Sequence, residues 1–168
     1  MNIISKFTVG SENGMDLFLA LKEAHLKEMY EGIIDPVRLN PYLEDELDRR
    51  KAINGLNDLS TQLVIVFDDD QPLGYAMIGK TFSQPAVVEG RRAVHLSFFV
   101  LPNYRIPEVC HSLWQKCLSV TKNHSYWTEL PANDAMIPFL ETIDFTVAEQ
   151  SQLKPFEVSS QVMVRQDI

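Results

Sequence analysis

Hydrophobic and polar residues recur along the chain with two periods, a period of two that is typical of strands and one of three to four that is typical of helices. In the first third, the pattern predicts a strand over residues 3–9, a turn at 11–14 and a helix that reaches about residue 29. A second helix is predicted over residues 42–54, because Asn40 can act as an N-cap and Pro41 suits the first helical position.

A hairpin and one long buried strand follow. Residues 61–67 and 73–79 predict two antiparallel strands, joined by an acidic turn at 68–72. Residues 93–101 carry the strongest strand signal, a nearly continuous apolar run that ends at Pro102. The polar segment 83–92 before that strand is expected to form a loop.

The last third predicts a helix, a strand, a short helix and a final hairpin. Pro107 and Glu108 suit the first turn of a helix, because Pro tolerates that position and an acid there faces the positive end of the helix dipole. Residues 126–130 predict a buried strand, 135–143 a short helix, and 145–149 and 161–165 two strands that can pair. Strands that bracket helices predict an α/β or α+β fold, here as one domain over residues 1–168.

Composition and charge narrow the possible partners. Hydrophobic residues make up 45% of the 168 residues and there are only 7 Gly, which excludes a disordered or low-complexity chain. The formal net charge of −8 repels phosphate backbones and anionic lipid surfaces. No apolar run approaches the roughly 20 residues of a membrane span, and no signal peptide opens the chain. We therefore expect a cytoplasmic monomer or homodimer that binds neither nucleic acid nor membrane.

The two cysteines, Cys110 and Cys117, are too few for a disulfide scaffold. Seven residues apart on one helix, they would be separated by about 10 Å along its axis, beyond the roughly 7 Å limit on the Cα separation in a disulfide. Free thiols are expected. Together with His111 and His124 they lack the close spacing of zinc ligands, so no metal site is expected.

Several motifs carry a resemblance to a known family. They are Val100-Leu101-Pro102-Asn103-Tyr104-Arg105 at the end of the long strand, the turn and apolar segment 68–77, Asn133, Phe139 in the short helix, and Asp144-Phe145 after it. In these motifs, and in the order of elements over nearly the whole chain, the protein resembles the GNAT family of acetyl-CoA-dependent N-acetyltransferases. The resemblance implies a central mixed, mostly antiparallel sheet of six to seven strands flanked by about four helices.

The resemblance also implies a binding site for acetyl-CoA as co-substrate. The strand end would pair with the pantetheine, and the turn after it would aim the backbone N–H groups of a helix N-terminus at the pyrophosphate. The implied cofactor-binding residues are Val100, Leu101, Arg105, Ile106, Pro107, Glu108, Val109, Cys110, Asn133 and Phe139. Glu108 and Cys110 fill the two glycine positions of the family motif, and Pro107 lacks an N–H. The structural alternative is that Pro107 and Glu108 simply begin a helix well.

Candidates for proton transfer are few. In the family, the aromatic residue of the short helix is often a Tyr that protonates the leaving thiolate, but Phe139 has no hydroxyl. His95 and Ser97 lie two apart on the long strand and so share a face, and a neutral His95 can accept a proton from an amine. The alternative for His95 is a satisfied core or surface residue. The other histidines are expected to be exposed on helices or turns; they are His25, His111 and His124.

Two functions from different classes follow. The first is an acyltransferase that moves an acetyl group from acetyl-CoA to a small-molecule or peptide amine, by direct attack in a ternary complex. The acidic run Glu44-Asp45-Glu46-Leu47-Asp48 could attract such a cation, or could be a solvated helix face. The second is a non-catalytic binding or structural protein on the same fold, with an eroded coenzyme A site.

Overall fold

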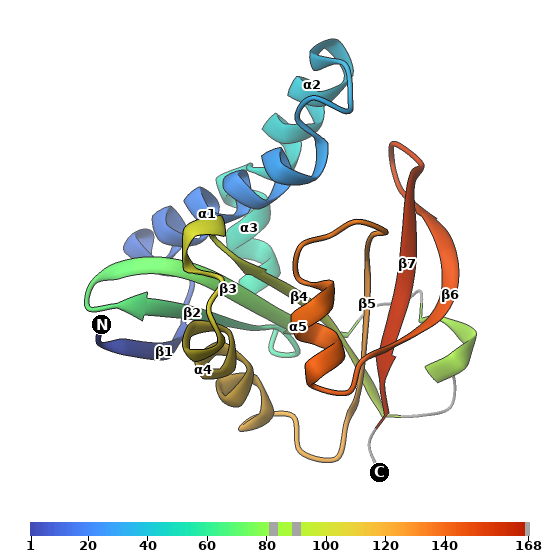
Figure 1. The fold of residues 1–168 in the computed structure, drawn as a ribbon. Coiled ribbons are helices and arrows are strands. Elements are labelled where there is room, and N and C mark those ends of the chain that lie inside the picture. Colours follow the sequence, from blue (N-terminus) through green and yellow to red (C-terminus); the bar gives the residue numbers. More distant parts are fainter. Residues whose placement is uncertain (81–83, 89–91, 167–168) are drawn as a thin grey trace.

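The computed structural model describes residues 1–80, 84–88 and 92–166, and in these ranges seven strands form one sheet in the order β1-β2-β3-β4-β5-β7-β6 (Figure 1). The strands are β1 (Ile3–Thr8), β2 (Gln62–Asp68), β3 (Gln71–Gly79), β4 (Ala93–Val100), β5 (Ser125–Pro131), β6 (Thr146–Leu153) and β7 (Val158–Arg165). The helices are α1 (Glu12–Tyr30), α2 (Pro36–Glu46), α3 (Arg49–Leu56), α4 (Pro107–Leu118) and α5 (Ile137–Thr142).

The sheet is mostly antiparallel, as predicted, and its single parallel pair decides the shape of the molecule. Among the described residues, β4 and β5 pair only at Ala93 with Ser125, Val94 with Tyr126 and His95 with Trp127. Beyond these pairs the strands diverge, while β4 stays paired with β3 and β5 with β7 (Figure 1). The sheet is therefore open between β4 and β5 toward their carboxyl ends.

Helices cover both faces of the sheet because its strands are apolar on both faces. On β4, Leu96 and Phe98 pack in the large core cluster beneath α4 and α5, whereas Phe99 packs with Phe18 and Leu21 of α1 on the opposite face. The carboxyl end of α1 is tied to α2 and to the β6–β7 turn by an aromatic trio. Its members are Tyr30, Tyr42 and Phe156, with ring centroids 5.0–5.8 Å apart.

The prediction of a single helix over residues 42–54 is wrong. Asp35 caps α2 by accepting the Val37 amide at 2.9 Å, and Asp48 caps α3 by accepting the Lys51 amide at 3.0 Å. Pro41, predicted to begin the helix, lies inside α2. The N–H that Pro41 lacks would bond to the Val37 carbonyl. Since Val37 is 81% exposed, water can satisfy that carbonyl instead, which makes the proline tolerable.

The remaining predicted strands and helices agree with the structure in type and order, but α1 begins at Glu12, inside the predicted turn at 11–14. The final hairpin forms from β6 and β7, as predicted. Both cysteines are free, as expected, and both are buried. The predicted loop 83–92 lies partly outside the described residues, and its described part contains a 3₁₀ turn with buried Val88. None of the described helices is long and apolar enough to cross a membrane.

The end of α5 is a Schellman motif that aims the chain back into the core. Phe145 donates its N–H to the Leu140 carbonyl at 3.0 Å, and both side chains are buried in the same cluster. Asp144, between them, has a φ of 74°, in the left-handed region that favours glycine. Asp144 therefore has the backbone conformation that glycine would adopt in a Gly-Phe pair at this turn.

Replacing Asp144 by Gly should stabilise the protein by about 0.5–1 kcal/mol, because Gly adopts the left-handed conformation without strain. Asp144→Ala is the matched control, since it removes the carboxylate but keeps a Cβ. Urea denaturation of the three proteins measures the difference. Equal stabilisation by both substitutions would show that the carboxylate, and not the backbone conformation, carries the strain.

Candidate functional site

The opening between β4 and β5 leads into two adjoining cavities. The main cavity, of about 340 Å³, lies over the diverging strands and beneath α1 and α2. The strand-end cavity, of about 220 Å³, lies between α1, Phe99, Arg105 and residues 131–135. The residues that line both are His25, Met29, Pro131 and Asp134. These four residues mark the junction of the cavities.

His95 and Ser97, the predicted catalytic candidates, both line the main cavity. The His95 ring contacts the edge of Trp127, with ring centroids 4.6 Å apart. Burial lowers the pKa of His95 to about 4, so its imidazole is neutral at pH 7. The Trp127 indole N–H is buried and has no hydrogen-bond partner within the described part of the chain. The floor of the cavity thus carries a neutral imidazole, whereas the unpaired indole N–H of Trp127 is itself buried.

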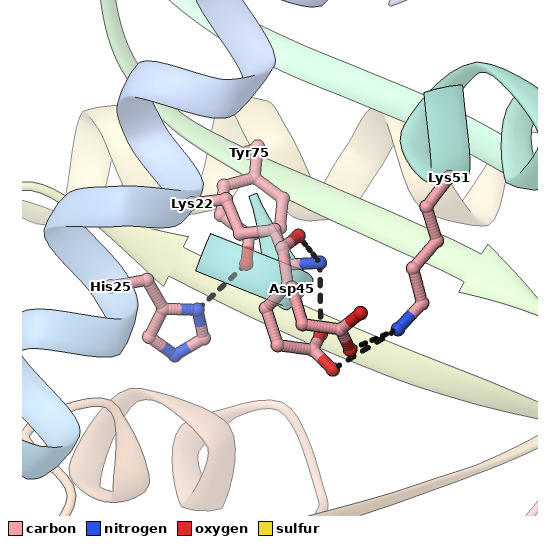
Figure 2. A network of polar contacts seen from close by, with 6 residues as sticks. Lys22, His25, Asp45, Lys51 and Tyr75 are labelled. Carbon is pink, nitrogen blue, oxygen red and sulfur yellow. Dashed lines mark hydrogen bonds and ion pairs between the residues drawn. The ribbon is translucent and has the colours of Figure 1, made fainter. Parts of the chain in front are cut away.

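His25 is not the exposed helix residue that the sequence suggested. Its Nδ1 lies 2.7 Å from the Tyr75 hydroxyl (Figure 2). Its ring stacks on Phe99, with centroids 4.6 Å apart and an interplanar angle of 18°. Burial, aided by the positive charges of Arg105 and Lys22, lowers the pKa of His25 to about 4. A sequence signal existed, because His25 continues the apolar stripe of α1 one turn after Leu21.

Acidic and basic side chains beside the main cavity are largely paired. Lys22 bonds to the Glu46 carbonyl at 3.0 Å and carboxylate at 3.2 Å, and Lys51 bonds to Asp45 at 2.8 Å (Figure 2). Of the predicted acidic run, only Glu46 lines this cavity, and Glu44 and Asp45 are solvated. Glu129 on β5 also lines the cavity, and no cation of the described residues pairs with it. No local pattern in the sequence marks Glu129 as a site residue.

The predicted pyrophosphate turn is partly occupied by contacts within the protein. Arg105 donates from Nε to the Val100 carbonyl at 2.8 Å and from Nη2 to Glu28 of α1 at 2.6 Å. Its guanidinium lies over the Phe99 ring, 5.7 Å from the centroid. Leu101 donates its N–H to the Leu73 carbonyl at 2.8 Å and accepts from the Tyr104 amide at 2.9 Å. Both backbone groups of Leu101 are therefore already used.

The first turn of α4 offers few free N–H donors. Pro107 has none, and the amides of Val109 and Cys110 both donate to the Ile106 carbonyl at 3.1 Å. Only the Glu108 amide of this turn is left, next to its own exposed carboxylate. The Cys110 side chain is buried in the core, which raises the pKa of its thiol to about 11. It is thus an unreactive core residue.

The remaining predicted residues flank the opening from the α5 side. Asn133 is exposed and lines the strand-end cavity. Phe139 stacks on Phe98 at 5.4 Å and contacts the edge of His111 at 5.2 Å. Burial raises the pKa of Asp134, which accepts the Met136 amide at 2.8 Å. Among the described residues, no three His, Cys, Asp or Glu side chains gather as metal ligands would.

Comparison with known proteins concerns most of the chain. The profile of the acetyltransferase (GNAT) family matches residues 21–145, and comparison with the curated proteins gave no match. The PaiA N-acetyltransferase from Thermoplasma acidophilum, solved with coenzyme A, is 12% identical, with a TM-score of 0.74 over 99% of this chain and 100% of that one.

Two other solved structures share the fold. A ribosomal-protein-alanine N-acetyltransferase from Brucella melitensis is 17% identical, with a TM-score of 0.63 over 98% of this chain and 99% of that one. YncA from Salmonella typhimurium, solved with acetyl-CoA, is 16% identical, with a TM-score of 0.65 over 99% and 94% of the respective chains. At these identities the likeness concerns the fold.

The lowered pKa values of His25 and His95 predict a pH-dependent stability. Between about pH 6.5 and pH 4 the unfolded chain binds protons at these residues while the folded protein does not, so the free energy of unfolding falls as the pH falls through this range. Each histidine should account for a loss on the order of 1–3 kcal/mol.

Urea denaturation at pH 7.5 and pH 4.5 tests this dependence, with the His25→Gln/His95→Gln double variant as control. Asp134 titrates in the opposite sense but is common to both proteins, so their difference isolates the histidines. An equally steep fall in the double variant would contradict the prediction.

Proposed function

Because the chain belongs to the acetyltransferase (GNAT) family, we propose that it is an N-acetyltransferase, which moves an acetyl group from acetyl-CoA to an amine by direct attack in a ternary complex. The observation that carries the proposal is the open edge of β4. Leu101 bonds to β3, and backbone groups alternate in direction along an antiparallel strand, so those of Phe98 and Val100 face the opening toward β5. No strand of the described residues pairs with them there.

This open edge suits the pantetheine arm of coenzyme A. Pantetheine is extended and carries two amides, which can pair with Phe98 and Val100 as an added strand would. The Val100 carbonyl is now bonded to Arg105, so the arm would have to displace that side chain. Freed from Val100 and Glu28, Arg105 can turn to the pyrophosphate, a dianion that attracts it more strongly than one carboxylate does.

The main cavity suits the acceptor amine. Glu129 attracts a cation, and the rings of Tyr30 and Tyr42 line the same space. We assign His95 as the base: it takes one proton from the ammonium and releases it to solvent, and the freed amine nitrogen then attacks the thioester carbonyl carbon. The C–S bond breaks and the thiolate leaves. The nitrogen loses its second proton, which the thiolate takes up, so the products are an amide and a free thiol. Ser97 lies on the same face of β4 and would help to orient the amine. No covalent intermediate with the protein is required.

A non-catalytic role on this fold is the second candidate, and one specific observation favours it. The first turn of α4 keeps a single free amide, beside the Glu108 carboxylate, while Arg105 is paired with Glu28. A pyrophosphate would therefore meet fewer donors than a turn with two glycines provides. Coenzyme binding separates the two candidates.

Isothermal titration calorimetry should detect acetyl-CoA and coenzyme A binding with micromolar dissociation constants, about −8 kcal/mol. Glu108→Gly should tighten binding about tenfold, because it removes a negative charge and lets the phosphate approach the backbone. Glu108→Gln, the matched control, removes the charge alone and should give part of that gain. No heat at millimolar ligand in any of the three proteins would favour the non-catalytic role.

His95→Gln should lower kcat/KM about 100-fold or more at pH 7, because the amine loses its proton acceptor. The loss should shrink toward pH 10, where free amine is abundant. His124→Gln is the matched control, since His124 lies outside both cavities and bonds to the Lys122 carbonyl. A coupled thiol-release assay measures the rates. A loss of the same size at every pH would contradict the assignment of His95 as base.

A further inference from the structure

His25 lies where the two substrates would meet. In the proposed function, on which this inference rests, the coenzyme enters along the strand-end cavity and the amine occupies the main cavity, so the thioester carbonyl must lie at their junction. Of the four residues that line both cavities, only His25 and Asp134 carry polar side chains. Asp134 already accepts the Met136 amide at 2.8 Å. A carboxylate accepts hydrogen bonds and does not donate them, so the His25 imidazole is the one side chain of these four that can donate to a carbonyl oxygen.

The tautomer of His25 follows from its bond to Tyr75. The Tyr75 side chain is buried, its burial raises its pKa so that the hydroxyl stays protonated, and His25 Nδ1 is its hydrogen-bond partner at 2.7 Å. A buried hydroxyl that donated to nothing would be costly, so the hydroxyl donates and Nδ1 accepts. The ring proton is therefore on Nε2. Figure 2 shows that nitrogen on the side of the ring away from Tyr75.

The ring is held in place and kept neutral. Phe99 stacks against one of its faces, and the edge of the Tyr75 ring approaches at 5.7 Å between centroids. Its Nε2 has no hydrogen-bond partner within the described part of the chain. The charged groups around it are Lys22 on its own helix, Arg105 from the β4–α4 turn, and the carboxyls of Glu28 and Asp134. The two cations disfavour an imidazolium, so Nε2–H is a neutral, fixed donor.

From this geometry we propose that His25 donates its Nε2–H to the carbonyl oxygen of the thioester and stabilises the oxyanion that forms when the amine attacks. The oxygen gains the electron pair of the carbonyl π bond as the C–N bond forms, and returns it when the C–S bond breaks. His25 keeps its proton throughout. A preorganised neutral donor at such an oxygen is worth most in the transition state and little in the ground state.

The test compares His25→Phe/Tyr75→Phe with Tyr75→Phe alone. Phe at position 25 keeps the stack on Phe99, and removing the Tyr75 hydroxyl in both proteins ensures that no buried donor is left without an acceptor. We expect the double variant to lose a further 100- to 1000-fold in kcat relative to Tyr75→Phe. The dissociation constant of acetyl-CoA should change by less than about twofold, and the loss should be the same from pH 6 to pH 9. When Gln replaces Phe at position 25 in the same Tyr75→Phe background, its amide N–H can reach the same place. That His25→Gln variant should have a kcat about tenfold higher than the His25→Phe variant.

Each contrary outcome has a distinct meaning. An unchanged kcat would overturn the role. Weaker binding of acetyl-CoA without a fall in kcat would also overturn it, and would assign the imidazole to a pantetheine carbonyl instead. A loss that disappears at high pH would overturn it in favour of a base. Transfer activity absent already from the wild-type protein would overturn the proposed function, and this role with it.

A second measurement needs no substitution. Nitrogen-15 spectra of the imidazoles distinguish the two neutral tautomers, and the chain has only four histidines. The His25 ring should carry its proton on Nε2 at pH 7, with no titration above pH 5. A proton on Nδ1 would overturn the role even if the double variant did not fold.

Discussion

The parallel pairing of β4 with β5 stops after three residue pairs. The opening between the strands and the two cavities depend on this early end of the pairing. Each strand keeps an antiparallel partner on its other side, β3 for β4 up to Val100 and β7 for β5 up to Pro131. The sheet therefore continues as two parts, and its twist carries them in different directions. Backbone groups in the middle of a sheet are left without a strand partner, which folded proteins rarely allow unless a ligand or water can satisfy them.

The charges around this opening suit the cationic acceptor of the proposed reaction. Lys22 is paired with Glu46 and Lys154 with Glu157, so the cations that line the main cavity are already satisfied. Both cavity histidines are neutral because burial penalises their charged form. What remains is the carboxyl groups of Glu129 and Asp134 and a set of aromatic faces. The same burial that keeps the imidazoles neutral also strengthens their hydrogen bonds to a bound substrate.

The strand-end cavity is arranged differently, because its polar groups satisfy one another. Arg105 bonds to Val100 and Glu28, and the first amides of α4 bond back to Ile106. A coenzyme entering here would exchange hydrogen bonds and not simply add them, and exchanged bonds contribute little net free energy. The attraction between Arg105 and a dianion would then supply most of the gain. This part of the chain departs furthest from the glycine-rich family motif, and it is also the most fully bonded.

Local signals in the sequence were sufficient for the order of the elements, the family and the helix start at Pro107, because periodicity and capping act within a few residues. The predicted start of α2 was wrong because local signals cannot choose between two similar N-caps. Asn40-Pro41 and Asp35-Pro36 carry nearly equal capping signals, and the helix begins at the second of these pairs. The site needed more than local information. His25 acquires its tautomer from Tyr75 and its place from Phe99, and Arg105 meets Glu28 of α1. The sequence by itself determined the order of the strands and helices, apart from the division between α2 and α3. Only the tertiary structure decided which side chains face the cavities, because strand register and helix packing bring distant segments together.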